Sequence, residues 1–321
     1  MTFVGIGLVG LIVLARIDYR LLKNFSGILY LLTIGMLLAT RFIGSEKLGA
    51  VRWIEIGSFQ FQPSELAKVF MAIVMAKFFS DNMDQMHKPK VFIKSLVYIG
   101  IPTILVALQP DLGTAMSFAI IWGSMLVVSN IKKRYVAGVV GLVACAMPIV
   151  YKFFLKDYQR KRIQTFLDPT ADPTGSGWNV AQAKIAIGSG GFWGRGLGRG
   201  PQSQLNFVPY KHTDFIFAAL AEEMGFVGAF AVIALFAVLL YRALRIAMLS
   251  RDYFGMFLGT GIFAIIFFHV FINIGMNLGI MPVTGIPLPL VSSGGTSVII
   301  TMFCIGILES IYTRYKKIDF E

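Results

Sequence analysis

The stretch FIFAALAEEMGFVGAFAVIALFAVLLY, residues 215–241, decides the fold class. Its only charged side chains are Glu222 and Glu223, among aliphatic, aromatic and small residues. About 20 apolar residues of helix are enough to cross the hydrocarbon core of a bilayer. We therefore predict a transmembrane helix over this stretch.

The rest of the chain has the same character. Of its 321 residues, 56% are hydrophobic and 14% are charged, against about 25% charged in soluble domains, and the mean hydropathy is +0.72. We find nine apolar runs near the length of a membrane span. They cover residues 2–16, 25–43, 64–80, 95–109, 112–130, 136–155, 215–241, 255–278 and 296–312. The sequence thus predicts an all-α, polytopic integral membrane protein of about nine transmembrane helices, forming one domain over residues 1–321.

The basic residues indicate an orientation. Five groups of three Lys or Arg lie in every second connection, within residues 16–23, 88–94, 132–134, 242–251 and 314–317. Because cytoplasmic connections carry an excess of Lys and Arg, we expect these groups inside, with the N-terminus outside and the C-terminus cytoplasmic. The net charge of +12 then favours contact with anionic membrane lipids, and no nucleic acid is expected as a partner.

One connection does not follow this alternation. Residues 156–211 carry eight basic residues against three aspartates on the predicted outer side, and long segments cross a membrane largely regardless of charge. Since a structureless loop of this length is uncommon in a compact protein, we expect this long extracytoplasmic loop to be a functional element.

The segment GSGGFWGRGLGRG, residues 188–200, holds seven glycines within that loop. Its spacing fits neither G-x-G-x-x-G nor G-x-x-x-x-G-K-[ST], which excludes those nucleotide-binding motifs. Two interpretations remain open. The segment is a flexible surface loop, or its backbone approaches a phosphate closely while Arg195 and Arg199 supply charge.

Asp214 lies directly before the run at 215–241. The side chain of Asp214, or that of Thr213, could simply cap the exposed amides of the helix. Alternatively, Asp214 is a general base at the outer mouth of a face of small residues, because Ala218, Ala221 and Gly225 follow it at helical spacing. Such small residues let a neighbouring helix or a ligand chain approach.

Three further charged side chains lie near predicted helix ends. Glu65 and Lys68, in QPSELAK, are three residues apart and can pair on one helix face; the pair either neutralises itself or presents an ammonium to a phosphate. Asp111, in QPDLGTA, could cap the following helix. Because Glu65, Asp111 and Asp214 all fall at outer helix ends, we expect them to converge there. Two of them with Lys68 could frame an acid–base site or hold a divalent ion.

Two pairs of residues have equally simple explanations. Arg52 and Trp53 place a cation beside an aromatic side chain, which fits the interfacial belt of a membrane protein as well as ligand contact. Asn273 and Asn277 lie four residues apart in the run 255–278. That spacing is more typical of hydrogen bonds between helices than of an active site.

Four ordered segments cover nearly the whole chain. They are RWIEIGSFQFQPSELAK (52–68), LQPDLGTA (108–115), AIGSGGFWGRGLGRGPQSQLNFVPYKHTDFIFAALAEE (186–223) and NIGMNLGIMPVTGIPLPLVSSGG (273–295). In this order they resemble the SEDS family of cell-wall polymerases, and the third segment looks more like its rod-shape branch than its division branch.

The resemblance implies a peptidoglycan glycosyltransferase that polymerises lipid II into glycan strands on the outer face of the bacterial cytoplasmic membrane during cell elongation. It implies a class B penicillin-binding protein, a transpeptidase, as partner. It also makes Asp214 the essential acid, matches Glu65, Lys68 and Asp111 to the family's other charged motif residues, and leaves open whether a divalent cation, Mg²⁺ or Mn²⁺, takes part. We place a supporting set of residues around the substrate: Arg52, Trp53, Arg195, Arg199, Lys211, His212 and Thr213.

The sequence departs from the family pattern in two places. Family members usually have ten spans, and this sequence begins where their second span would. Two explanations stay open, a misassigned start codon and a nine-span variant. The family's Ile-Ser-Tyr-Gly-Gly motif stands here as Val-Ser-Ser-Gly-Gly, residues 291–295, so that any role of the tyrosine is lost.

Two other functional classes stay open. Buried charges and a groove of small residues would also suit a flippase that carries lipid II across the membrane, although no inverted repeat is evident. The third class is a non-catalytic scaffold of the elongation machinery.

Overall fold

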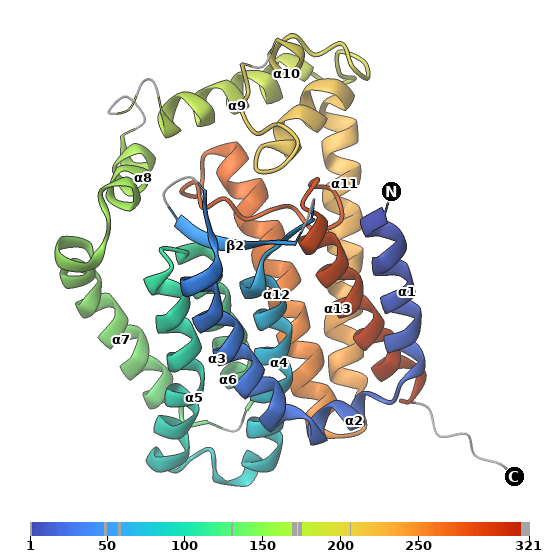
Figure 1. The fold of residues 1–321 in the computed structure, drawn as a ribbon. Helices are drawn as coiled ribbons and strands as arrows, with labels where there is room; N and C mark the ends of the chain where they lie inside the picture. The colour runs from blue at the N-terminus through green and yellow to red at the C-terminus, as the bar shows by residue number, and fades with distance from the viewer. Residues whose placement is uncertain are drawn as a thin grey trace, which may run out of the picture. The chain divides into compact units, whose positions relative to one another are not determined.

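The structure is a computed structural model that describes residues 2–47, 50–56, 59–129, 131–168, 172, 175–205 and 207–315. Over these residues, nine helices coincide with the nine predicted runs (Figure 1). They are α1 (Thr2–Arg16), α3 (Ser26–Ile43), α4 (Pro63–Asp81), α5 (Pro89–Leu108), α6 (Leu112–Val128), α7 (Lys133–Ile149), α11 (Ile216–Leu249), α12 (Tyr253–Leu278) and α13 (Gly295–Thr313). The predicted all-α, polytopic fold is confirmed.

Six of these helical segments are long and apolar enough to cross a membrane. They are α3, α5, the segment Arg134–Phe153, α11, α12 and α13, while α1 and α6 are shorter apolar helices. The ninth, α4, carries Glu65, Lys68 and Lys77 along its length. Its side chains are nevertheless mostly buried, because α4 packs against neighbouring helices on several sides.

The remaining elements do not correspond to any of the nine apolar runs. Helix α2 (Tyr19–Asn24) follows α1, and a three-stranded antiparallel sheet of β1 (Ser45–Lys47), β2 (Ala50–Ile56) and β3 (Phe59–Phe61) precedes α4. Trp53 pairs with Ser45 and Ile54 with Phe61 across this sheet. A turn of 3₁₀ helix (Met83–Gln85), a π-helix (Val150–Phe154), and helices α8 (Asp157–Leu167), α9 (Ser176–Gly190) and α10 (Pro201–Gln204) complete the described elements.

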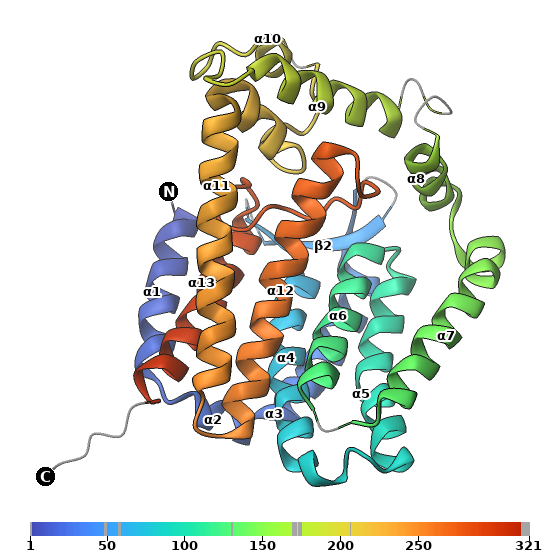
Figure 2. The same ribbon diagram turned by 180° about the vertical axis from the view of Figure 1, so that it is seen from behind.

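The chain divides into two compact units. The first consists of Met1–Val136, Leu240–Phe268 and Gly295–Glu321, and the second of Ala137–Leu239 and His269–Gly294. Within the first unit, α1 and α13 lie side by side (Figures 1 and 2), and α4 contacts α3, α5, α6 and α13. Met71, Met75 and Phe79 of α4 are fully buried, so this helix supplies much of the core of the unit.

Hydrogen bonds gather the connections of the first unit into two sets. In one set, the Tyr19 backbone amide donates to Ser310 Oγ and the Tyr19 hydroxyl donates to Asp252. In the other, an Arg52 guanidinium nitrogen donates to the carbonyl of Pro110, and Thr296 Oγ1 donates to the carbonyl of Gln60. The two sets gather connections that the basic residues assign to opposite sides of the membrane, and which set faces the cytoplasm stays a prediction.

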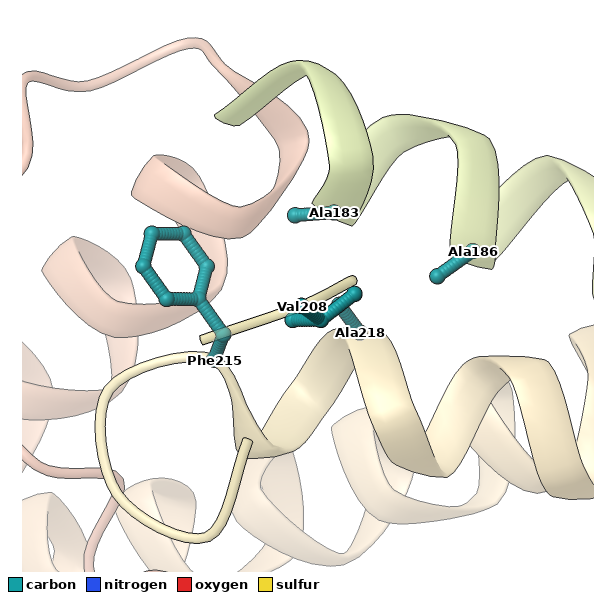
Figure 3. Close-up of a cluster of buried hydrophobic side chains, with 5 residues drawn as sticks. All are labelled: Ala183, Ala186, Val208, Phe215 and Ala218. Atoms are coloured by element: carbon teal, nitrogen blue, oxygen red, sulfur yellow. The ribbon is translucent and has the colours of Figure 1, made fainter. Parts of the chain in front are cut away.

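The second unit has a small core around the start of α11. Ala183 and Ala186 on α9 lie against Ala218, Val208 and Phe215, all fully buried or nearly so (Figure 3). Alanine side chains permit close helix packing. The face of small residues predicted along α11 is therefore occupied at Ala218 by a neighbouring helix.

Candidate functional site

Asp214 lies two residues before the first residue of α11 and is half-buried. Burial raises the pKa of its carboxyl group above the ordinary value, while the nearby Arg162 guanidinium and a hydrogen bond from Thr213 act in the opposite direction. Withdrawal from water disfavours the charged form of a carboxyl group, and a nearby cation favours it. The result is a carboxylate whose basicity exceeds that of an exposed aspartate, as general-base catalysis requires.

Two asparagines of α12 hold the backbone of Asp214. The side-chain amides of Asn273 and Asn277 each donate to the Asp214 carbonyl at 3.0 Å. Asn273 also donates to the carbonyl of Ile286 at 2.8 Å. Asn277 Oδ1 also accepts from the Ala218 amide of α11 at 3.0 Å, which confirms an interhelical hydrogen bond for this pair. The side-chain amides of both asparagines hold the backbone of the candidate base.

Two serines hold the preceding residues in the same way. Ser292 Oγ donates to the Thr213 carbonyl at 2.7 Å and accepts from the Leu288 amide at 2.8 Å. The amide and the hydroxyl of Ser293 both donate to the His212 carbonyl, at 2.8 and 2.7 Å. Ser293 stands where the family pattern has tyrosine, so this position retains a backbone contact to the loop that carries Asp214.

The glycine-rich segment packs its backbone against a break in α11. Gly225 has φ +69° and ψ −167° within that helix, a conformation that only glycine adopts without strain. Around the break, the Arg195 amide donates to the Glu222 carbonyl and the Phe226 amide donates to the Gly191 carbonyl, both at 2.9 Å. The glycines thus let the backbone of residues 191–196 contact the backbone of α11. The hydrogen bonds between them pair amides and carbonyls that the helix break would leave unpaired.

Glu222 anchors the end of the same segment. Its carboxylate is fully buried and accepts hydrogen bonds from the amides of Gln202 and Ser203, at 2.8 and 2.9 Å, and from the Ser203 hydroxyl. A Cβ at Gly200 would lie 2.5 Å from a carboxylate oxygen of Glu222. Glu222 is therefore a structural acid that ties the first turn of α10 to α11.

The cations predicted around the substrate differ in their surroundings. Arg195 and Arg199 are exposed, and Arg195 Nε donates to the Ser189 carbonyl at 2.8 Å. Lys211 is half-buried and donates to the Ser203 carbonyl. The Arg195 and Arg199 guanidinium groups form no ion pair within the described part of the chain.

Glu65 and Lys68 form the ion pair that their spacing predicts. Lys68 Nζ lies 2.7 Å from Glu65 Oε1, and the two residues are 1% and 5% exposed. Uncompensated charges at this depth would be strongly unfavourable. The pair makes the burial of both side chains possible at the N-terminal end of α4.

Asp111 combines a structural and an electrostatic contact. Its carboxylate accepts from the Thr114 amide at 3.1 Å, which confirms the predicted cap of α6. It also accepts from Gln62, the residue before α4, at 3.3 Å and lies 3.8 Å from an Arg52 nitrogen. The Trp53 side chain, next to Arg52 on β2, is half-buried.

The structure thus brings Arg52, Gln62 and Asp111 together beside the Glu65–Lys68 end of α4. Asp214 belongs to the second unit, and the expected convergence of the three carboxylates stays a prediction. Among the described residues, no three or more His, Cys, Asp and Glu side chains gather in a way that could hold a metal ion.

Comparison with known proteins places this geometry in context. A family profile described as a cell cycle protein, FTSW_RODA_SPOVE, matches residues 1–317. The peptidoglycan glycosyltransferase MrdB of Escherichia coli K12 is 43% identical over 98% of this chain and 85% of its own length. A probable peptidoglycan glycosyltransferase FtsW of Geobacter sp. M18 is 38% identical over 97% of this chain and 85% of its own.

Solved structures give the same result. The rod shape determining protein RodA of Thermus thermophilus matches with a TM-score of 0.72 and 27% identity, covering 98% of this chain and 87% of that one. A chain of a peptidoglycan synthase complex that coordinates polymerization and crosslinking matches with a TM-score of 0.84 and 29% identity, covering 98% and 89%. By profile, identity and coverage, the chain belongs to the SEDS family of FtsW, RodA and SpoVE, whose curated relatives above are peptidoglycan glycosyltransferases.

Proposed function

We propose that this chain polymerises lipid II into glycan strands, with Asp214 as the general base. The observation that supports this role is the fixed position of a half-buried aspartate whose pKa is raised. The backbone carbonyls of His212, Thr213 and Asp214 all accept hydrogen bonds from side chains. A base held in one place removes much of the orientational cost of proton transfer.

The proposed reaction is a displacement at an anomeric carbon. A sugar hydroxyl of one lipid-linked chain attacks the anomeric carbon of another, and a new glycosidic C–O bond forms. The bond from that carbon to the lipid diphosphate breaks, and its electron pair leaves with the diphosphate. Asp214 takes the hydroxyl proton and later releases it to water. General-base assistance of this kind contributes about 10²- to 10⁴-fold.

Negative charge accumulates on the departing diphosphate. Lys68, with Arg195, Arg199 and Lys211 as further candidates, is proposed to stabilise that charge in the transition state. Arg52 and Asp111 would fix the end of α4 and the turn before α6. Trp53, next to Arg52, and His212 and Thr213, which precede Asp214, are proposed as supporting residues.

The proposal includes a setting for this reaction. The 43% identity to a curated MrdB supports the elongation branch, and the likeness to a chain of a synthase complex supports a crosslinking partner, a class B penicillin-binding protein. The alternating basic residues support an extracytoplasmic Asp214 and a cytoplasmic C-terminus in the bacterial inner membrane.

The decisive experiment gives labelled lipid II to the purified chain in detergent, with and without its transpeptidase partner. Detergent removes the second compartment that transport needs, so a ladder of glycan strands demonstrates polymerisation. Asp214→Asn should reduce ladder formation about 10²-fold or more, and Asp157→Asn, which changes an exposed aspartate of α8, should leave it near wild type. Liposome translocation of lipid II without any ladder would instead identify a carrier.

A further inference from the structure

A small pocket, open to solvent, lies between α8, α9 and the segment that follows α12, all within the second unit. Arg162, Thr165 and Phe166 of α8 line one part of it, and Lys184 of α9 lines another together with Met281 and Pro282. Two cationic side chains therefore share a small pocket whose other walls are largely apolar. None of the roles described above uses Arg162 or Lys184 to bind a ligand.

The position of Lys184 depends on a glycine. Gly279 has φ +73°, and a Cβ at this position would lie 2.1 Å from Lys184 Cε and 2.4 Å from its Nζ. Any other residue would be strained at this φ and would displace the ammonium group. Within the described residues, Lys184 forms no ion pair, so its charge is available to a ligand in the pocket.

Arg162 connects the pocket to Asp214. Its charge acts on the Asp214 carboxyl group, so that one guanidinium lies within electrostatic reach of the candidate base while lining the pocket. The chain continues from the pocket wall at Val283 to Gly285, where a Cβ would lie 3.6 Å from Asp214 Oδ2. Between them, the buried Thr284 hydroxyl has no hydrogen-bond partner among the residues that the structure describes, and it lies next in sequence to the pocket wall at Val283.

The chemistry of these groups selects a class of ligand. A guanidinium offers paired N–H donors that match phosphate oxygens, and an ammonium adds a compact charge. Hydrophobic side chains beside them suit the start of a prenyl chain. A diphosphate ester of a lipid satisfies both requirements, because its phosphates carry the charge and its lipid carries the apolar surface.

We propose that Arg162 and Lys184 form a binding site for the diphosphate of a lipid-linked sugar, beside Asp214. The inference rests on the proposed function and deepens it, since it assigns two cations outside the recognised motif residues to substrate binding. A phospholipid head group offers the same phosphate chemistry, so the experiment must distinguish the two sources.

The test measures binding without turnover. The full-length chain in detergent is titrated with farnesyl diphosphate by isothermal titration calorimetry, with farnesol as the uncharged probe and phosphatidylglycerol as competitor. We expect binding of the diphosphate, none of farnesol, and little displacement by phosphatidylglycerol. Lys184→Met and Arg162→Met should each raise the Kd about ten-fold or more, the loss expected for one charge-assisted hydrogen bond.

Lys161→Met is the matched control, because Lys161 is exposed on α8 and does not line the pocket. An equal Kd for Lys184→Met and Lys161→Met would overturn the proposal. The proposal would also fail if phosphatidylglycerol displaced farnesyl diphosphate as effectively as added farnesyl diphosphate does. Failure of the proposed function is distinguishable, because the glycan ladder would then be absent from the wild-type chain whatever the binding data. Binding should persist in Asp214→Asn, which removes only the base.

Discussion

The side chain of Asn277 is inserted between Asp214 and Ala218, two residues that an α-helix would join directly. Its Nδ2 donates to the Asp214 carbonyl and its Oδ1 accepts from the Ala218 amide, both at 3.0 Å. In a regular helix that amide would donate to the carbonyl four residues earlier. The inserted amide satisfies both groups and keeps Asp214 just outside α11.

Asn277→Asp should separate these two contacts. The aspartate can still accept from the Ala218 amide, but its second oxygen has no proton to donate to the Asp214 carbonyl, which then keeps only the hydrogen bond from Asn273. A buried polar atom left without a partner, here that second oxygen, costs about 1–3 kcal/mol. We expect the rate of glycan synthesis to fall at least ten-fold, with a larger effect on kcat than on KM. Asn82→Asp is the control, since it removes a similar side-chain contact to the Phe78 carbonyl at the end of α4. An unchanged kcat in Asn277→Asp would contradict the positioning role.

The two serines of the Val-Ser-Ser-Gly-Gly motif should respond differently to substitution by alanine. Ser292 is buried and uses its hydroxyl both to donate and to accept, so Ser292→Ala breaks two contacts. Ser293 is exposed, and its backbone amide keeps a hydrogen bond to the His212 carbonyl after the hydroxyl is removed. Thermal unfolding in detergent should show a lower Tm for Ser292→Ala and a Tm close to wild type for Ser293→Ala. Equal losses would show that the backbone bond does not hold this loop.

The fold was largely predictable because nine apolar runs are a strong local signal. The details of the site were not, because they depend on contacts between residues far apart in sequence. The spacing of Asn273 and Asn277 predicts an interhelical contact. The sequence around them does not show that their partner is the Asp214 carbonyl, about 60 residues earlier.

The glycine-rich segment illustrates the same limit. Its composition fits a flexible loop or a phosphate-binding backbone equally well, and the structure shows a third use, the closure of the helix break at Gly225. That break is invisible in a run of apolar residues. The Arg162–Lys184 pocket also escapes sequence reasoning, because its two cations lie on separate helices in a connection with few apolar runs.

The ionisation of Asp214 should affect activity and stability in opposite directions. A base must be deprotonated, so activity should rise with pH through the raised pKa of Asp214. Stability follows the opposite sign: a carboxyl group whose pKa is higher in the folded state destabilises the fold above that pKa, and this effect disappears below its ordinary pKa. At neutral pH, Asp214→Asn should thus lose activity by about 10²-fold or more while its Tm equals or exceeds that of the wild type.

The pH profile provides a further check on that assignment. Arg162 is the charged group that lowers the pKa of Asp214, against the effect of burial. Arg162→Gln should therefore shift the acid limb of the activity profile to higher pH, whereas Lys161→Gln should leave it in place. A shift to lower pH would contradict the electrostatic role of Arg162.

Glu222→Gln should loosen α10 and the residues before it while leaving the contacts that hold Asp214 in place. The amide replaces one acceptor oxygen with a donor, opposite the Gln202 and Ser203 amides that now donate to the carboxylate. We expect faster hydrogen exchange over residues 195–205 and a lower Tm. Glu223, the half-buried residue next to Glu222, provides the control. In Glu223→Gln the backbone amides of residues 195–205 should exchange at the wild-type rate. Normal exchange in Glu222→Gln would show that other contacts hold this segment.

The Glu65–Lys68 pair allows a structural role to be separated from a catalytic one. Removing one partner of a buried ion pair typically destabilises a protein by about 3–5 kcal/mol, because the other charge is left uncompensated, whereas replacing both with apolar residues is often neutral. Lys68→Met alone should therefore lower both Tm and activity, and the combination of Glu65→Leu with Lys68→Met should restore the Tm. If Lys68 stabilises the departing diphosphate, the double variant will fold and still make no glycan strands. Recovery of activity together with Tm would show that the pair only neutralises itself. Lys77→Met, on the same helix, is the control and should leave Tm and activity near wild type.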